Sequence, residues 1–160
     1  MSNDKTAAYH TQVEELIRQH GWIVQKVFPT EADPDHNPFQ YTIGLHDRGL
    51  PELISIGLPG DVGQLLLNDV VEVLTQRQAA GLPLTGELTH VNWDVKFYLV
   101  DADKTQAEEV ALGARRRSQG KAAYLQVCWP DVESHFYWDA QASENYRAAQ
   151  PLLGTPPVLN

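Results

Sequence analysis

The amino-acid sequence predicts an α+β fold, a mostly antiparallel sheet with about three packed helices, on three observations. Apolar runs follow one another with short turns between them, which favours antiparallel pairing. Helical patterns interrupt these runs in the order α-β-β-β-α-β-β-α-β, without the strict alternation of a doubly wound α/β fold. The 160 residues contain 42% hydrophobic and 21% charged residues, which predicts a single folded domain over residues 1–160.

A helix and three strands are expected in the first part of the chain. Apolar residues recur at helical spacing up to His20, and Gly21 stands where a glycine often ends a helix, which predicts a helix over residues 4–20. In the second strand the odd-numbered positions are apolar and face one way. Ser55 is the main polar residue of the third strand, as expected of a strand covered on both faces. The three strands are expected at residues 22–28, 39–46 and 53–58.

Two further helices and three further strands are expected in the rest of the chain. A long helix opens at Gly60 and ends before Gly81. Thr105 and Glu108 have the spacing of a capping box, which predicts a helix that ends near Gly120. The strands are expected at residues 84–90, 95–100 and 123–129, and an extended tail is expected from about residue 150.

Charge and cysteine content restrict the partners and the compartment. A formal net charge of −9 repels phosphate backbones, so no nucleic-acid partner is expected. Cys128 is the only cysteine, which excludes an internal disulfide and agrees with a reducing compartment. The chain shows neither a secretory-signal pattern nor an apolar run long enough to span a bilayer, so we expect a cytoplasmic protein without a membrane partner. Base rates alone favour a homodimer.

Short motifs link the chain to a family. They are YTIGL at residues 41–45, PELI at 51–54, GLP at 57–59, CWPD at 128–131 and FYWD at 136–139. In combination they resemble the uncharacterised bacterial domain-of-unknown-function family 4262, over about residues 21–153. Tyr137 stands where members of that family usually show a proline. The resemblance implies the domain assignment, and it implies no particular activity or cofactor.

Motifs for metal or nucleophilic chemistry are weak. The six histidines form no HxH, HxxxH or HExxH pair, so no metal site is predicted. A site assembled from His46, His90, His135 and a carboxylate stays geometrically conceivable. Cys128 lies in a strand pattern without a neighbouring base, which favours a buried structural thiol over a nucleophile.

Two other segments favour structural roles. Residues 57–63 lie between a strand and a helix but match neither phosphate-loop motif, and Asp61 complements the helix dipole instead. Arg115, Arg116 and Arg117 are expected in a last helical turn, where they are mainly solvated. One or two of them could still hold a carboxylate or a phosphate.

The best candidate site lies where the last strand ends. Aromatic residues are concentrated there, and loops at strand ends often carry binding groups on a fixed scaffold. We expect the polar face of strand 39–46 to join them in a pocket for a small molecule or a peptide. Trp129 is expected to be mostly buried with its indole nitrogen paired, and Asp131 to stay exposed. The predicted lining residues are Tyr41, Thr42, His46, Trp129, Asp131, His135 and Trp138.

Two alternatives remain open. The first is a hydrolase- or lyase-like enzyme in which His46 or His135 acts as general base beside Asp131, because imidazole titrates near neutrality and a carboxylate orients it. The second is a protein-interaction module, which predicts a contiguous exposed apolar patch instead of a concave pocket.

Overall fold

The computed structural model describes residues 2–34, 36–90 and 92–157, so the last three residues of the predicted tail lie outside the described residues. The helices are α1 (Ser2–His20), α2 (Gly60–Ala79), α3 (Lys104–Val110), α4 (Leu112–Ser118) and α5 (Glu144–Ala149), with a short 3-10 helix η1 (Leu45–Arg48). The strands are β1 (Ile23–Val27), β2 (Phe39–Ile43), β3 (Glu52–Ile56), β4 (Gly86–Leu88), β5 (Phe97–Asp101) and β6 (Tyr124–Cys128). Within these ranges no helix is both long and apolar enough to cross a membrane.

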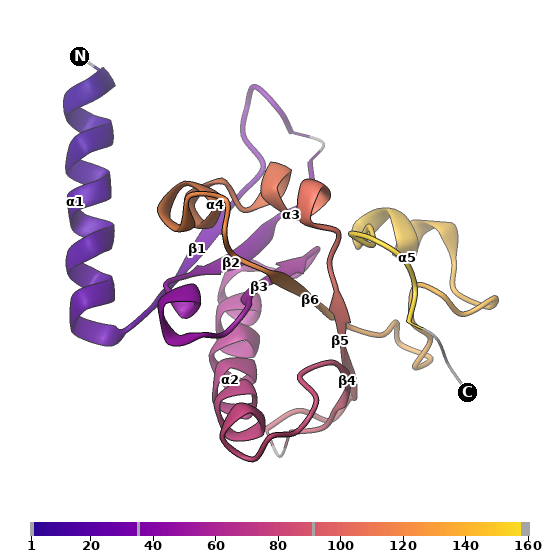
Figure 1. Cartoon of the computed structure of the whole chain (residues 1–160). Coiled ribbons are helices and arrows are strands. Elements are labelled where there is room, and N and C mark those ends of the chain that lie inside the picture. Colours follow the sequence, from indigo (N-terminus) through magenta and orange to yellow (C-terminus); the bar gives the residue numbers. More distant parts are fainter. Residues whose placement is uncertain (1, 35, 91, 158–160) are drawn as a thin grey trace.

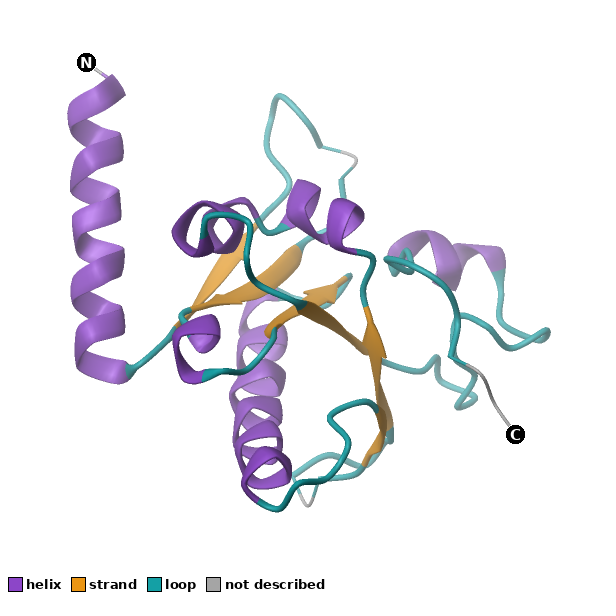
Figure 2. Cartoon of the chain, in the orientation of Figure 1, coloured by secondary structure: helices purple, strands orange, loops and turns teal. Residues whose placement is uncertain are grey.

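The six strands form one sheet in the order β1-β2-β3-β6-β5-β4. Only β3 and β6 pair in parallel, with Glu52 opposite Tyr124, and the other four pairs are antiparallel. Helix α2 lies on one face of the sheet, and α3 and α4 lie on the other (Figures 1 and 2). The fold is therefore α+β with a mostly antiparallel sheet, as predicted.

Each face of the sheet carries its own apolar core. Leu53 of β3 and Leu125 of β6 pack with α2 on one face of the sheet. Their sequence neighbours Ile54 and Tyr124 pack with α3 and α4 on the other face. This alternation follows from the two-residue period of a strand. Strand β3 is buried along its whole length, which confirms the prediction of a strand covered on both faces.

Helix α2 packs unusually close to β2 at Gly63. A Cβ atom at this position would lie 1.8 Å from the side-chain oxygen of Gln40. Gln40 is buried and pairs with the Ser55 hydroxyl and the Leu58 carbonyl, so it cannot easily move away. Gly63, in the first turn of α2, thus serves close packing, in agreement with the structural interpretation of residues 57–63.

Strand β2 ends at Ile43, three residues earlier than predicted, because a buried carboxylate bends the chain. Glu52 is 1% exposed, and its two oxygens accept hydrogen bonds from the Thr42 hydroxyl and from the backbone N–H groups of Gly44, Leu45 and His46. These donors turn the chain into η1. Leu45 consequently packs on the α2 side, opposite to the other odd-numbered residues of this run.

The predicted third helix is two helices, and a fifth helix was missed. Ala111 breaks the third helix with a non-helical ψ of 62°, and the N–H of Gly113 then bonds to the Tyr41 hydroxyl. The helix cap is also earlier than predicted, because the Asp103 side chain accepts from the Gln106 N–H. Helix α5 has only 6 residues, too few for a clear apolar period.

Arg117, at the end of α4, ties three segments together. Its guanidinium lies 2.8 Å from Glu14 of α1 and 2.7 Å from Asp47 of η1. The Arg117 side chain is 20% exposed, but the Glu14 and Asp47 side chains are 56% and 53% exposed, so each ion pair adds only modestly to the packing of α1 against the body of the fold. Arg117 thus departs from the mainly solvated position expected for the arginine run.

Candidate functional site

The seven predicted lining residues do not come together in one pocket. Thr42 and His46 lie at the end of the sheet where β3 and β6 begin, beside Glu52. Trp129 follows the opposite end of β6, and Trp138 lies further along the same loop. The length of β6, roughly 13 Å at about 3.3 Å per residue, separates the two groups. Tyr41 is buried between them against α4.

Trp129 organises the end of the sheet at which β6 stops. Its indole N–H donates to the Ile56 carbonyl at 2.8 Å, as predicted, although the ring is only partly buried. Its backbone carbonyl accepts from the Tyr146 hydroxyl, and its backbone N–H and carbonyl both pair with the Gln150 side chain. Helix α5 is therefore fastened to the main chain at Trp129.

Gly57 allows this close approach of α5. Its φ of +94° is a conformation that other residues rarely adopt, and a Cβ atom would lie 2.3 Å from the Ala149 carbonyl and 2.9 Å from the Trp129 ring. The GLP and CWPD motifs are thus parts of one packing arrangement at the sheet end.

Asp131 closes the loop that follows β6. Its carboxylate accepts hydrogen bonds from the backbone N–H groups of Glu133 and His135, and it lies 3.2 Å from Nδ1 of His135. Desolvation acts to raise the pKa of Asp131, but the bonds from His135 and Glu133 outweigh it and leave the pKa below its ordinary value. The expectation of an exposed Asp131 was wrong, since its side chain is 18% exposed and caps the loop.

A second turn positions the FYWD motif. The Asp139 carboxylate accepts from the Phe136 N–H at 2.7 Å, and Arg147 of α5 donates to the carbonyls of Tyr137 and Asp139. Tyr137 lies beside the Arg147 guanidinium, 5.9 Å from the ring centroid. Phe136 and Trp138 instead contact the ring of Tyr98.

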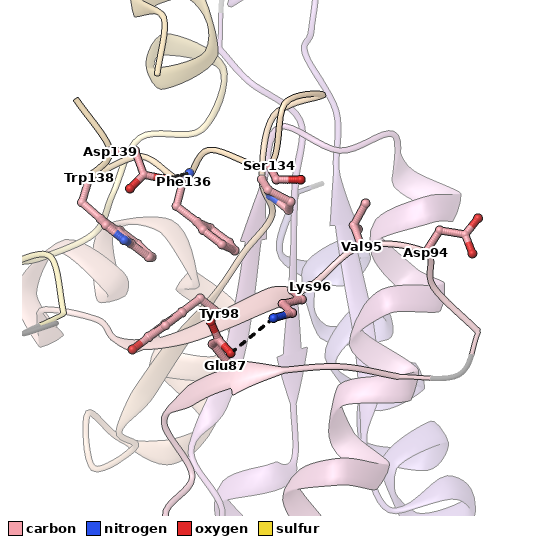
Figure 3. A pocket seen from close by; sticks show the side chains of 10 residues that line it. Glu87, Asp94, Val95, Lys96, Tyr98, Ser134, Phe136, Trp138 and Asp139 are labelled. Atoms are coloured by element: carbon pink, nitrogen blue, oxygen red, sulfur yellow. Dashed lines mark hydrogen bonds and ion pairs between the residues drawn. The ribbon is translucent and has the colours of Figure 1, made fainter. Parts of the chain in front are cut away.

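Phe136 and Trp138 form, with Tyr98 of β5, an aromatic pocket of about 580 Å³ (Figure 3). The two loop rings are stacked, with centroids 5.1 Å apart and an interplanar angle of 4°. Tyr98 stands nearly perpendicular to both, at 6.0 Å and 5.2 Å. The other lining residues are Glu87, Asp94, Val95, Lys96, Pro130, Ser134 and Asp139.

The aromatic pocket lies in an acidic surrounding. Its lining holds three carboxylates and one ammonium group, so its formal charge is −2. Lys96 lies 3.9 Å from Glu87, and both side chains are more than 60% exposed, so this ion pair is weak. Asp94 forms no ion pair with any described residue, and its side chain points away from the pair in Figure 3.

Of the seven predicted residues, only Trp138 lines the aromatic pocket. Tyr98 was missed because its partner, Cys128, is thirty residues away in the sequence, and only the β5–β6 pairing joins them. No local signal marks Tyr98, because residues 97–100 are all apolar or aromatic, and only the structure leaves Tyr98 half-buried between the buried residues Phe97 and Leu99. Glu87 and Lys96 likewise meet only through the β4–β5 hairpin.

The remaining reactive side chains are placed as follows. Cys128 is buried, and burial raises the pKa of its thiol to about 12, which confirms the structural interpretation. His135 pairs with Asp131, whereas His46 lies at the far end beside Glu52. In the part of the chain that the structure describes, no three histidine, cysteine or acidic side chains are grouped as metal ligands would be.

The fold and the site define an α+β domain with an aromatic pocket at the end of its sheet. The family model described as "Domain of unknown function (DUF4262)" matches residues 16–143, and the chain belongs to this family. No curated protein matches the chain. No solved structure matches it either.

Proposed function

We propose that this protein binds a small molecule or a peptide in the aromatic pocket. The observation that carries this proposal is a concave site of about 580 Å³ in which three aromatic rings meet a few charged groups. Ligand sites in proteins have this size and this mixture of apolar walls with a few polar groups. The pocket lies at the end of β6, where the sequence predicted the binding loops.

The loop that carries the pocket is held in place before any ligand arrives. Asp131 caps its first turn, Asp139 caps its second, and Arg147 donates to two carbonyls of the second turn. A preformed site binds more tightly than one that must order on binding, because less conformational entropy is lost. The rigid loop supports a binding role, because it holds the Phe136 and Trp138 rings at the pocket instead of letting them pack into the core.

Protein-observed NMR with a fragment set that includes neutral, cationic and anionic members tests the proposal. We expect hits whose shift changes centre on Tyr98, Phe136 and Trp138 and vanish in the Phe136→Ala variant. Phe28→Ala is the matched control, because Phe28 is 53% exposed and follows β1 at the opposite edge of the sheet. A fragment set that produces no such hits in the wild-type protein contradicts the proposal.

A general-base enzyme is the second candidate, supported by the contact between His135 and Asp131. With Nδ1 facing the carboxylate at 3.2 Å, the Nε2 atom of His135 is the one left for a substrate. Neither residue lines the aromatic pocket, but their neighbours Pro130, Ser134 and Phe136 do. A panel of ester, amide and lyase substrates tests this candidate. Turnover that His135→Gln fails to reduce would refute it.

A further inference from the structure

We propose that the ligand of the aromatic pocket is an organic cation, whose charged group lies against the Phe136 ring. This inference rests on the proposed function and narrows it to one class of ligand. Three features carry it: the balance of charge around the pocket, the half-buried aromatic rings that line it, and the position of Lys96.

The charge balance favours a cation over an anion. Glu87, Asp94 and Asp139 line the pocket with Lys96, which leaves the formal charge of the lining at −2. The Arg147 guanidinium, which donates to the Asp139 carbonyl, offsets part of this charge, and the whole chain has a net charge of −9. A carboxylate or phosphate ligand would enter against this field, whereas a cation is attracted by it. Asp94 has no ion-pair partner among the described residues, and its carboxylate points away from the aromatic rings in Figure 3, so it acts on a bound cation through its field and not by direct contact.

The rings supply the second part of a cation site. Trp138 covers one side of Phe136, and Figure 3 shows Val95 and Lys96 beyond the other side, across the pocket. A positive group over an aromatic face is attracted by the ring quadrupole, while an anion is repelled. Tyr98 stands at a steep angle to this stack and closes it from below in the same view.

Lys96 already places a positive charge at this pocket. Its ammonium lies 3.9 Å from Glu87 and is 63% exposed, so it can move away when another cation arrives. A cationic ligand would then compete with Lys96 for Glu87. The inference therefore predicts that removing the Lys96 charge strengthens binding, whereas an anionic ligand would lose affinity.

Choline and its uncharged isostere 3,3-dimethylbutan-1-ol provide the test, since they share a shape and differ in charge. We expect choline to bind about tenfold more tightly by NMR titration of the Trp138 indole signal. A peptide that carries trimethyllysine distinguishes the source of the cation. If the peptide binds more tightly than choline, the cation is peptide-borne, and if not, it is a free small molecule.

Charge variants give the second readout. Asp94→Asn should weaken choline binding about threefold, and Lys96→Gln should strengthen it about threefold. The affinity for 3,3-dimethylbutan-1-ol should stay the same in both variants. Lys5→Gln is the matched control, because Lys5 is exposed on α1 at the opposite edge of the sheet.

The outcomes separate this inference from the proposed function. Equal binding of choline and its isostere, or a loss of choline affinity in Lys96→Gln, overturns the cation class and leaves the proposed pocket standing. If neither these compounds nor any fragment shifts the Trp138 signal, the proposed function itself is wrong.

Discussion

Glu52→Gln should cost about 3 kcal/mol of unfolding free energy, although it removes no atom from the core. Each carboxylate oxygen of Glu52 accepts two hydrogen bonds: one from Thr42 and Leu45, the other from Gly44 and His46. In the glutamine variant, an NH2 group replaces one of these two oxygens. This group is itself a donor, so it cannot accept the two hydrogen bonds that the oxygen accepted. Even if the Thr42 hydroxyl reverses its role, at least one buried N–H group loses its acceptor, at roughly 1–3 kcal/mol.

The remaining bonds also weaken in this variant, because hydrogen bonds to an ionised acceptor are about twice as strong as neutral ones. Burial raises the pKa of Glu52, and its four donors only partly offset this, so the comparison is best made at pH 7 and above. Urea unfolding followed by tryptophan fluorescence measures the change. A loss of about 3 kcal/mol corresponds to a midpoint lower by roughly 1–3 M.

Glu109→Gln is the matched control, because Glu109 is exposed on α3 and should shift the midpoint within about 0.5 kcal/mol. Thr42→Ser keeps the bridging hydroxyl and should be much milder than Thr42→Val, which removes it. If Glu52→Gln is no more destabilising than Glu109→Gln, then the buried carboxylate does not hold the turn after β2, and our explanation of that turn is wrong.

Four further predictions concern the end of the sheet that carries the aromatic pocket. Trp129→Ala should lower the free energy of unfolding by roughly 3–5 kcal/mol. Trp129→Phe should lower it by about 1 kcal/mol, because this variant loses mainly the hydrogen bond to the Ile56 carbonyl. Urea midpoints measure both changes. Arg147→Met should cost about 1.5–3 kcal/mol and weaken fragment binding, in contrast to Arg116→Met at an exposed position. Because the pKa of Asp131 is lowered in the folded protein, the ionised carboxylate stabilises the fold above its ordinary pKa, and this contribution is lost as the pH falls through the lowered pKa. The difference in urea midpoint between wild type and Asp131→Asn should therefore shrink between pH 7 and about pH 3. Cys128, with its pKa raised to about 12 by burial, should react with a disulfide reagent only in denaturant, and fast labelling of the native protein would contradict its burial.

The candidate site was predictable in part. The sequence pointed to the loop after β6, because aromatic residues cluster there beyond Pro130, and Trp138 does line the aromatic pocket. The sequence also grouped Thr42 and His46 with these aromatic residues. Strand alternation shows which face of the sheet a side chain takes, but it does not show which strand ends lie side by side. The pairing of β3 with β6 places those two residues at the other end.

Local patterns determined the helices and strands of this protein. The apolar period of α2, the alternation in β2 and the glycine after α1 are all properties of neighbouring residues, and the sequence predicts them because their physical causes act within a few positions.

Tertiary structure alone decided where β2 ends and which residues form the pocket. Glu52 reaches back across a turn to bend residues 44–46, and Tyr98 meets Phe136 only because β5 pairs with β6. A pattern within one segment cannot carry this information, because the energy of each contact depends on a partner that folding brings from another part of the chain.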